Sequence, residues 1–243
     1  KTRRIFAHSW SLSWPMTLIM FCVFVVGLAD VYVAGKFGKE VQAAYGLVFQ
    51  LYFIFSIIAT ALSVGAVSVI ARLFSSGDSR RTTEALDSAF ILSLVTGVVA
   101  GVVGFVFSPA IITIMRVPEI LKGYAVLFMR VYALGIACNY VLLNTNAFLR
   151  ACGMIRKSLG TMVAVCLLNV VLNFYLAFKT PLGYSGIAVA TVISTAFGGV
   201  LNLIFLRGRM SSRVRFSLKT AREIVRIGWP AGVLQILWQV GAM

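Results

Sequence analysis

Long apolar stretches alternate with short polar, mostly basic connections along the whole of this chain. A helix rising about 1.5 Å per residue needs roughly 20 apolar residues to cross the hydrocarbon core of a bilayer. Six stretches meet that length, at residues 14–34, 47–73, 86–107, 121–148, 159–178 and 185–206. A seventh begins at Trp229-Pro230 and is still running at Met243. The pattern therefore predicts six membrane spans and the beginning of a seventh.

We expect these spans to be helices, because every backbone N–H and C=O group in a bilayer core must be paired within the protein. The strands of a membrane barrel would be about 10 residues long and would alternate in polarity. The apolar runs of this sequence are longer and do not alternate. The predicted fold class is an all-α membrane protein, a six-transmembrane-helix bundle with the start of a seventh helix.

Composition and charge exclude several function classes. The chain is 60% hydrophobic and 12% charged, whereas about a quarter of a typical soluble domain is charged. Its 22 Lys and Arg against 7 Asp and Glu give a net charge of +15, but the basic residues are confined to short connections. A nucleic-acid-binding protein needs a polar surface to carry its basic stripe. We therefore expect neither a soluble enzyme nor a nucleic-acid partner, and the lipid bilayer is the predicted environment.

The distribution of basic residues predicts the orientation in the membrane. Sixteen of the 22 Lys and Arg residues lie on the side of the N-terminus, five lie on the opposite side, and Arg130 lies inside the fourth span. Cytoplasmic connections are enriched in Lys and Arg. The expectation is a multi-pass protein of the inner (plasma) membrane with a cytoplasmic N-terminus.

A short repeat suggests how the chain is organised. Leu12-Ser13-Trp14-Pro15 matches Ile227-Gly228-Trp229-Pro230, and each opens an apolar run after a basic stretch. Parallel repeats of this kind occur in transporters. We predict an N-terminal six-helix lobe at 1–210, a cytoplasmic amphipathic linker helix at 211–228, and the truncated start of a second lobe at 229–243. The rest of a second six-helix lobe is then expected beyond Met243. A chance match of the Trp-Pro pair is the alternative.

One acidic residue, Asp30, lies inside a predicted span. The fourteen residues before it, 16–29, carry no charge, and Val31 to Ala34 continue the apolar run. Ionisable residues in spans usually face the bundle interior and mark ion or proton paths. The alternative is that the first span ends earlier and Asp30 lies at the membrane interface.

A depth estimate brings three further residues to the level of Asp30. Counted along its helix, Asp30 lies about 22 Å from the cytoplasmic side, and Asn169 and Asn173 lie about 16 and 22 Å up the fifth span. Thr191 of the descending sixth span lies at about 21 Å. Oxygen ligands with one negative charge suit a proton or Na⁺. The alternative for the two asparagines is hydrogen bonding between helices.

Other polar residues permit two interpretations. Asn144 and Asn146 could line a substrate cavity or satisfy the helix end near Arg150, and Gln50 could line the cavity or lie at the interface. Sequences of the HExxH, GxSxG or Walker type do not occur, and cysteine and histidine do not cluster. We therefore predict no enzyme activity and no cofactor other than a coupling ion, H⁺ or Na⁺.

The chain resembles the multidrug and toxic compound extrusion (MATE) family. The resemblance is carried by Trp14-Pro15 through Gly27-Leu28-Ala29-Asp30, by Leu149-Arg150-Ala151-Cys152-Gly153, by Asn169-Val170-Val171-Leu172-Asn173 and by Leu182 to Thr191. It implies one lobe of a twelve-helix antiporter that exports cationic, amphipathic compounds in exchange for H⁺ or Na⁺. It further implies that Asp30 is the ion-responsive carboxylate, with Asn169, Asn173 and Thr191 as additional ligands.

One departure from the family pattern bears on ion binding. Position 173 is Asn where a subgroup of the family often has Asp, which leaves Asp30 as the one charge at the implied site. A flippase for lipid-linked saccharides, from the same superfamily, is the alternative function. It would need basic residues in the cavity, for which Arg130 is the candidate. A membrane scaffold without transport is a third hypothesis.

Overall fold

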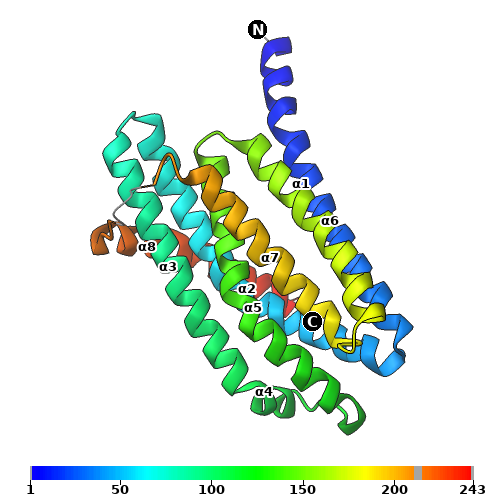
Figure 1. Ribbon diagram of the computed structural model, residues 1–243. Coiled ribbons are helices and arrows are strands. Elements are labelled where there is room, and N and C mark those ends of the chain that lie inside the picture. The colour runs from blue at the N-terminus through cyan, green and yellow to red at the C-terminus, as the bar shows by residue number, and fades with distance from the viewer. Residues whose placement is uncertain (1, 211–214, 242–243) are drawn as a thin grey trace.

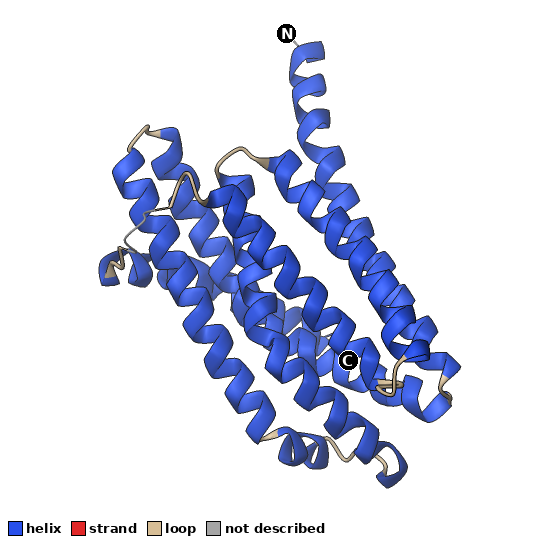
Figure 2. Cartoon of the chain, in the orientation of Figure 1, coloured by secondary structure: helices blue, strands red, loops and turns tan. Residues whose placement is uncertain are grey.

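The structure is a computed structural model, and it describes residues 2–210 and 215–241. Within these ranges it consists of helices joined by short connections (Figures 1 and 2). The helices are α1 (Thr2–Lys36), α2 (Lys39–Ser75), α3 (Ser79–Val106), α4 (Ser108–Ile114), α5 (Glu119–Ala151), α6 (Ile155–Lys179), α7 (Ser185–Leu206) and α8 (Leu218–Gly241). Six are long and apolar enough to span a membrane: Ser13–Lys36 of α1, together with α2, α3, α5, α6 and α7. The predicted all-α six-span bundle is confirmed.

Helix α2 begins well before the apolar run that predicted it. It starts at Lys39, directly after a turn in which Gly38 has a φ of 122°, a region that glycine enters without a steric penalty. Buried residues recur along its first turns at Val41, Ala44, Tyr45 and Val48. This spacing of three and four residues is that of one helix face. The early start adds a buried tyrosine to the bundle interior.

Helix α5 lies at the centre, packed against α2, α3 and α7. Its contact with α3 is close because glycines of α3 face it. A methyl group added at Gly97 would lie 2.9 Å from the Ala137 Cα, and one at Gly101 would lie 2.7 Å from the Ala133 carbonyl oxygen. Small residues allow membrane helices to approach in this way, since apolar side chains gain little by leaving lipid.

Helices α1 and α6 run side by side along one side of the bundle (Figure 1). α6 also packs along α7, which in turn packs on α5. Helix α1 therefore meets the rest of the bundle chiefly through α6, with further contacts to α2 and α7. This arrangement brings α1, α2, α6 and α7 around one interior region.

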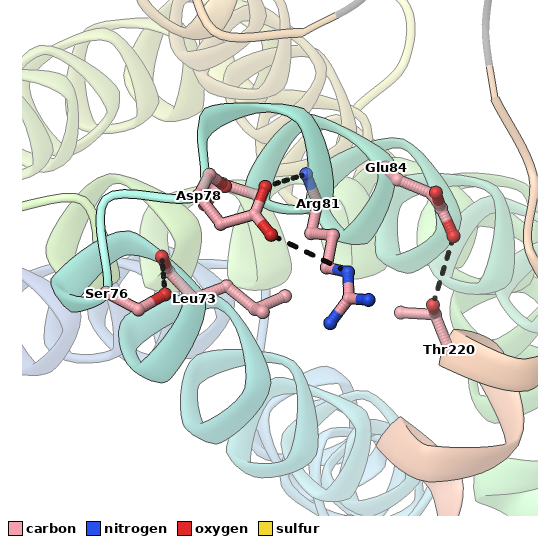
Figure 3. Close-up of polar contacts among 7 residues, drawn as sticks. Leu73, Ser76, Asp78, Arg81, Glu84 and Thr220 are labelled. Atoms are coloured by element: carbon pink, nitrogen blue, oxygen red, sulfur yellow. Dashed lines mark hydrogen bonds and ion pairs between the residues drawn. The ribbon is translucent and has the colours of Figure 1, made fainter.

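The α2–α3 and α5–α6 connections and the C-terminal end of α7 lie at the same end of the bundle as the N-terminal end of α1 (Figure 1). We call it the basic end. Here Asp78 caps α3 by accepting a hydrogen bond from the Arg81 backbone N–H at 3.0 Å (Figure 3). The Thr220 hydroxyl of α8 donates to Glu84 of α3 at 3.5 Å. The start of α8 is thus held against α3.

Helix α8 runs without a break from Leu218 to Gly241, with Pro230 inside it. It packs against α2, and the two backbones nearly touch: a methyl group at Gly65 would overlap the Ile224 carbonyl oxygen, and one at Gly228 would overlap that of Ala61. Residues 211–214, at the start of the predicted linker, and 242–243, at the predicted start of a second lobe, fall outside the described residues. The division at 210 and 228 stays a prediction.

Candidate cation site

Asp30 lies on the face of α1 that is buried in the bundle. Its exposed fraction is 2%, and Val33 and Ala34 on the same face are fully buried. The spacing of three and four residues places these side chains together on one side of the helix. The opposite side of α1 is apolar and exposed, as expected of a surface in contact with lipid; Leu28 and Tyr32 lie on it.

Three helices supply hydrogen-bond donors to the Asp30 carboxylate. The Tyr45 hydroxyl of α2 donates to Oδ2 at 3.1 Å, and the Thr191 hydroxyl of α7 lies 3.4 Å from the same oxygen. The Asn173 side-chain amide of α6 donates to Oδ1. The carboxylate therefore joins the first two helices, α1 and α2, to α6 and α7, which lie more than 100 residues later in the sequence.

A second set of contacts extends this group along α6 and α7. The Asn169 amide nitrogen lies 3.3 Å from Thr191 Oγ1 and 3.3 Å from Ser194 Oγ. Asn169 and Asn173 are completely buried, yet their Oδ1 atoms have no hydrogen-bond partner among the described residues. We call Asp30, Tyr45, Asn169, Asn173, Thr191 and Ser194 the Asp30 cluster.

Among the described residues, the Asp30 carboxylate is stabilised by these neutral hydrogen-bond donors and forms no ion pair with a cationic side chain. Within the described residues the ion pairs are Arg72–Glu223, Arg81–Asp78 and Lys122–Glu119, all at least partly exposed. A carboxylate without a cationic partner is costly inside a membrane protein. The carboxylate and the two unpartnered amide oxygens are hard ligands of the kind that bind hard cations, and because they carry a single negative charge we expect them to suit a proton or a monovalent cation such as Na⁺.

The structure brings Asp30, Asn169, Asn173 and Thr191 together, as the depth estimate expects. Their role as an ion site stays a prediction. The structure does not place the three residues predicted to line a substrate cavity in the Asp30 cluster. Gln50 is exposed, Asn144 is buried and donates to the Ala59 and Tyr140 carbonyl oxygens, and Asn146 is buried and accepts a hydrogen bond from Ser158. Their assignment to a substrate cavity also stays a prediction.

Arg130 does not face the Asp30 cluster. Its side chain is exposed on α5, where its Nε lies 3.4 Å from Ser108 Oγ of α4 and its guanidinium lies over the Phe105 ring at 5.7 Å. Ser108 is the first residue of α4, which lies at the end of the bundle opposite the basic end (Figure 1). Nothing in this geometry makes Arg130 part of a polar cavity.

Sequence reasoning missed Tyr45 and Ser194. Tyr45 precedes the apolar run at 47–73, and its inclusion in a helix depends on the turn at Gly38. The sequence does carry a signal, the helical spacing of Val41, Ala44, Tyr45 and Val48, and the structure buries all four. Ser194 follows Thr191 by three residues, so the two side chains share one helix face.

Comparisons with known proteins agree on one group of transporters. The MatE family model matches residues 15–175. Probable multidrug resistance protein YoeA of Bacillus subtilis is 25% identical over 213 residues, which is 82% of this chain and 46% of that protein. The FAD transporter of Shewanella oneidensis is 23% identical, over 93% of this chain and 52% of that protein.

The solved structures that resemble the chain belong to the same group. One is the outward-facing conformation of a multidrug resistance MATE family transporter, with a TM-score of 0.84 and 26% identity. The match covers 93% of this chain and 51% of that structure. The chain therefore spans about half the length of the relatives it matches.

Proposed function

The chain belongs to the MATE transporter family, and from this premise we propose that it forms one lobe of an ion-coupled exporter of small organic compounds. The observation that carries the proposal is the environment of Asp30: a buried carboxylate with donors from three other helices and no cationic partner among the described residues. Such a group changes its interactions when it gains or loses H⁺ or Na⁺.

The proposed cycle uses two states of the Asp30 cluster. With the ion absent, the carboxylate is held by Tyr45, Thr191 and Asn173, and the lobe favours the conformation that takes up substrate. With H⁺ or Na⁺ bound, those hydrogen bonds rearrange and the lobe favours the conformation that releases it. A ligand shifts a conformational equilibrium only by its difference in affinity for the two states. The contacts of Asp30 with three other helices provide a source for that difference.

We propose cationic, amphipathic compounds as substrates, exchanged for H⁺ or Na⁺. The names of relatives support drug-like substrates, since YoeA is a probable multidrug resistance protein and MepA of Staphylococcus haemolyticus a multidrug export protein. One relative is a FAD transporter, so an anionic compound belongs in the assay. The flippase alternative has no support from Arg130, which is exposed at the far end of α5.

We further propose that the basic end faces the cytoplasm and that a second lobe of the same transporter completes the substrate path. The basic side chains of the α2–α3, α5–α6 and α7–α8 connections support this orientation. Labelling of single cysteines at Ser76 and Leu182 with a membrane-impermeant reagent in intact cells tests it. Labelling is expected at Leu182. Labelling at Ser76 alone would show that the basic end faces the outside of the cell, which would contradict the proposed orientation.

The test of the function is Asp30→Asn in the full-length protein, reconstituted in liposomes. Efflux of the fluorescent cation ethidium, driven by a proton or Na⁺ gradient, is expected to fall at least tenfold, with FAD uptake measured in parallel. Asp78→Asn is the matched control, because Asp78 is a partly exposed helix cap and Asn caps a helix equally well. Gradient-driven efflux at the wild-type rate in Asp30→Asn would exclude Asp30 from coupling.

A further inference from the structure

A second group of buried polar residues lies nearer the basic end than the Asp30 cluster. It shares helices α6 and α7 with that cluster. The Asn202 amide of α7 donates to Thr145 Oγ1 of α5 at 3.1 Å, and both residues are completely buried. Thr161 of α6 is also completely buried. We call Thr145, Thr161 and Asn202 the inner polar layer.

The register of the three helices follows from one close contact. A methyl group added at Gly198 of α7 would meet Val165 of α6 and Leu142 of α5, so these three positions lie at one level. One helical turn nearer the basic end, α7 reaches Asn202, α6 reaches Thr161, and α5 reaches Thr145. The contact between Asn202 and Thr145 agrees with this register.

Two oxygen atoms in the inner polar layer lack a partner. Thr161 Oγ1 and Asn202 Oδ1 are buried and have no hydrogen-bond partner among the described residues. Unpaired polar groups are especially unfavourable in a membrane protein, where lipid cannot hydrogen-bond. A water molecule donating to the Asn202 oxygen and bonding the Thr161 hydroxyl would satisfy both, and ordered waters in protein interiors hold such positions.

Three of the four unpartnered oxygens in the two polar groups belong to residues of one face of α6. Thr161, Val165, Asn169 and Asn173 recur every four residues and are all buried. Three of these four side chains carry a buried oxygen without a partner. Val165 interrupts the series, at the level where Gly198 and Leu142 close around it. A polar stripe thus runs from the Asp30 cluster toward the basic end, with one apolar level in it.

We propose that the inner polar layer is an internal water site through which the coupling ion, H⁺ or Na⁺, passes between the Asp30 cluster and the basic end. Leu142, Val165 and Gly198 form the closed barrier of this route. Thr161 lies about 9 Å along α6 from its first residue, Ile155, and one turn or less separates it from the Ser158–Asn146 hydrogen bond. The route lies inside the lobe and so is separate from a substrate path between lobes. The part of this inference that concerns the ion rests on the proposed function. The part that concerns the water site does not.

The water site is tested first, without transport. In a full-length protein whose native cysteines, including the four of this chain, are all replaced by Ser or Ala, Thr161→Cys is labelled with methanethiosulfonate ethylammonium. The reagent reacts with the thiolate, which forms only where water reaches the sulfur. The matched control is Val163→Cys, two residues away on the exposed apolar face of α6. Labelling of Thr161→Cys at least ten times faster than the control is expected, and equal rates would overturn the water site.

Transport then tests the route for the ion. Thr161→Val removes a hydroxyl whose oxygen has no partner, so the fold is expected to be retained, as monodispersity and melting temperature report. Gradient-driven efflux is expected to fall roughly tenfold, while equilibrium ion binding to the purified protein stays unchanged. Thr96→Val is the control, because the Thr96 hydroxyl bonds its own helix in α3 at 2.6 Å.

The two proposals fail in different ways. If Asp30→Asn abolishes coupled efflux but Thr161→Val transports at the wild-type rate, the route through the lobe is wrong and the proposed function stands. If Asp30→Asn transports normally, the proposed function fails and the route fails with it. The labelling rates still decide whether the inner polar layer holds water.

Discussion

Tyr45 of α2 donates a hydrogen bond from its hydroxyl to Oδ2 of Asp30 on α1, at 3.1 Å. The two residues lie on either side of the turn at Gly38. This hydrogen bond therefore links α1 and α2 inside the bundle, in addition to the chain connection at the turn. Tyr45 has an exposed fraction of 1% and packs edge-on against the Phe128 ring of α5 at 5.9 Å. Its hydroxyl is therefore positioned by the bundle core and not by solvent.

Tyr45→Phe is expected to strengthen ion binding at Asp30. The hydroxyl stabilises the ion-free carboxylate, so its loss disfavours the empty state. A hydrogen bond to a charged group contributes about 1.5–3 kcal/mol, and about 1.4 kcal/mol is a tenfold change in affinity. The concentration of H⁺ or Na⁺ giving half-maximal coupled efflux should fall roughly tenfold. Tyr175→Phe, on the exposed face of α6, is the control, and an unchanged or higher half-maximal concentration contradicts the prediction.

Asn173→Asp is expected to increase Na⁺ affinity. The substitution keeps the shape of the side chain, replaces the amide donor to Asp30 with a carboxylate oxygen, and adds a negative charge. Two carboxylates this close repel each other unless a cation lies between them. Binding of radioactive Na⁺ to the purified full-length protein should tighten at least tenfold.

The matched control for that substitution is Asn139→Asp. The Asn139 amide bonds Ser56 of α2 at 3.3 Å, outside the Asp30 cluster, so an added charge there should leave the Na⁺ affinity of the cluster unchanged. Equal Na⁺ affinity in Asn173→Asp and wild type would show that residue 173 does not contact the ion.

The Asp30 cluster could be predicted in part because depth in a membrane helix follows from counting residues. A rise of about 1.5 Å per residue brings Asp30, Asn173 and Thr191 to one level without knowledge of packing. The same count cannot tell which faces of the helices meet. The hydrogen bonds from Asn173 and Thr191 to Asp30 depend on how α1, α6 and α7 are rotated, and rotation is set by contacts far apart in the sequence.

The packing of α8 on α2 could not be predicted for the same reason. Gly65 lies inside an apolar run and Gly228 beside the Trp-Pro pair, and neither position signals a partner. The close approach of the α2 and α8 backbones at these glycines is visible only in the three-dimensional structure. Tyr45 was missed because hydropathy marks where a span is apolar, whereas α2 begins earlier, at the Gly38 turn.

Glu223→Gln is expected to have little effect on stability. The Arg72 Nη2 and Glu223 Oε1 atoms are 2.6 Å apart, but the two side chains are 61% and 40% exposed. Exposed ion pairs typically contribute no more than about 1 kcal/mol, because water screens them. The melting temperature of the purified full-length protein should change by a few degrees at most. A large loss of stability would mean that this pair holds α8 in place.

Gly228→Ala, in contrast, is expected to destabilise the contact between α8 and α2. The added methyl group would overlap the backbone carbonyl oxygen of Ala61, which cannot move aside as a flexible side chain can. Overpacking of this kind costs about 1–3 kcal/mol. Gly27→Ala is the matched control, since a methyl group there meets no atom within 4 Å and alanine favours a helix interior by up to about 1 kcal/mol. The melting temperature of the full-length protein should fall for Gly228→Ala and hold or rise for Gly27→Ala. Equal melting temperatures would show that α8 and α2 are not packed backbone to backbone in the protein.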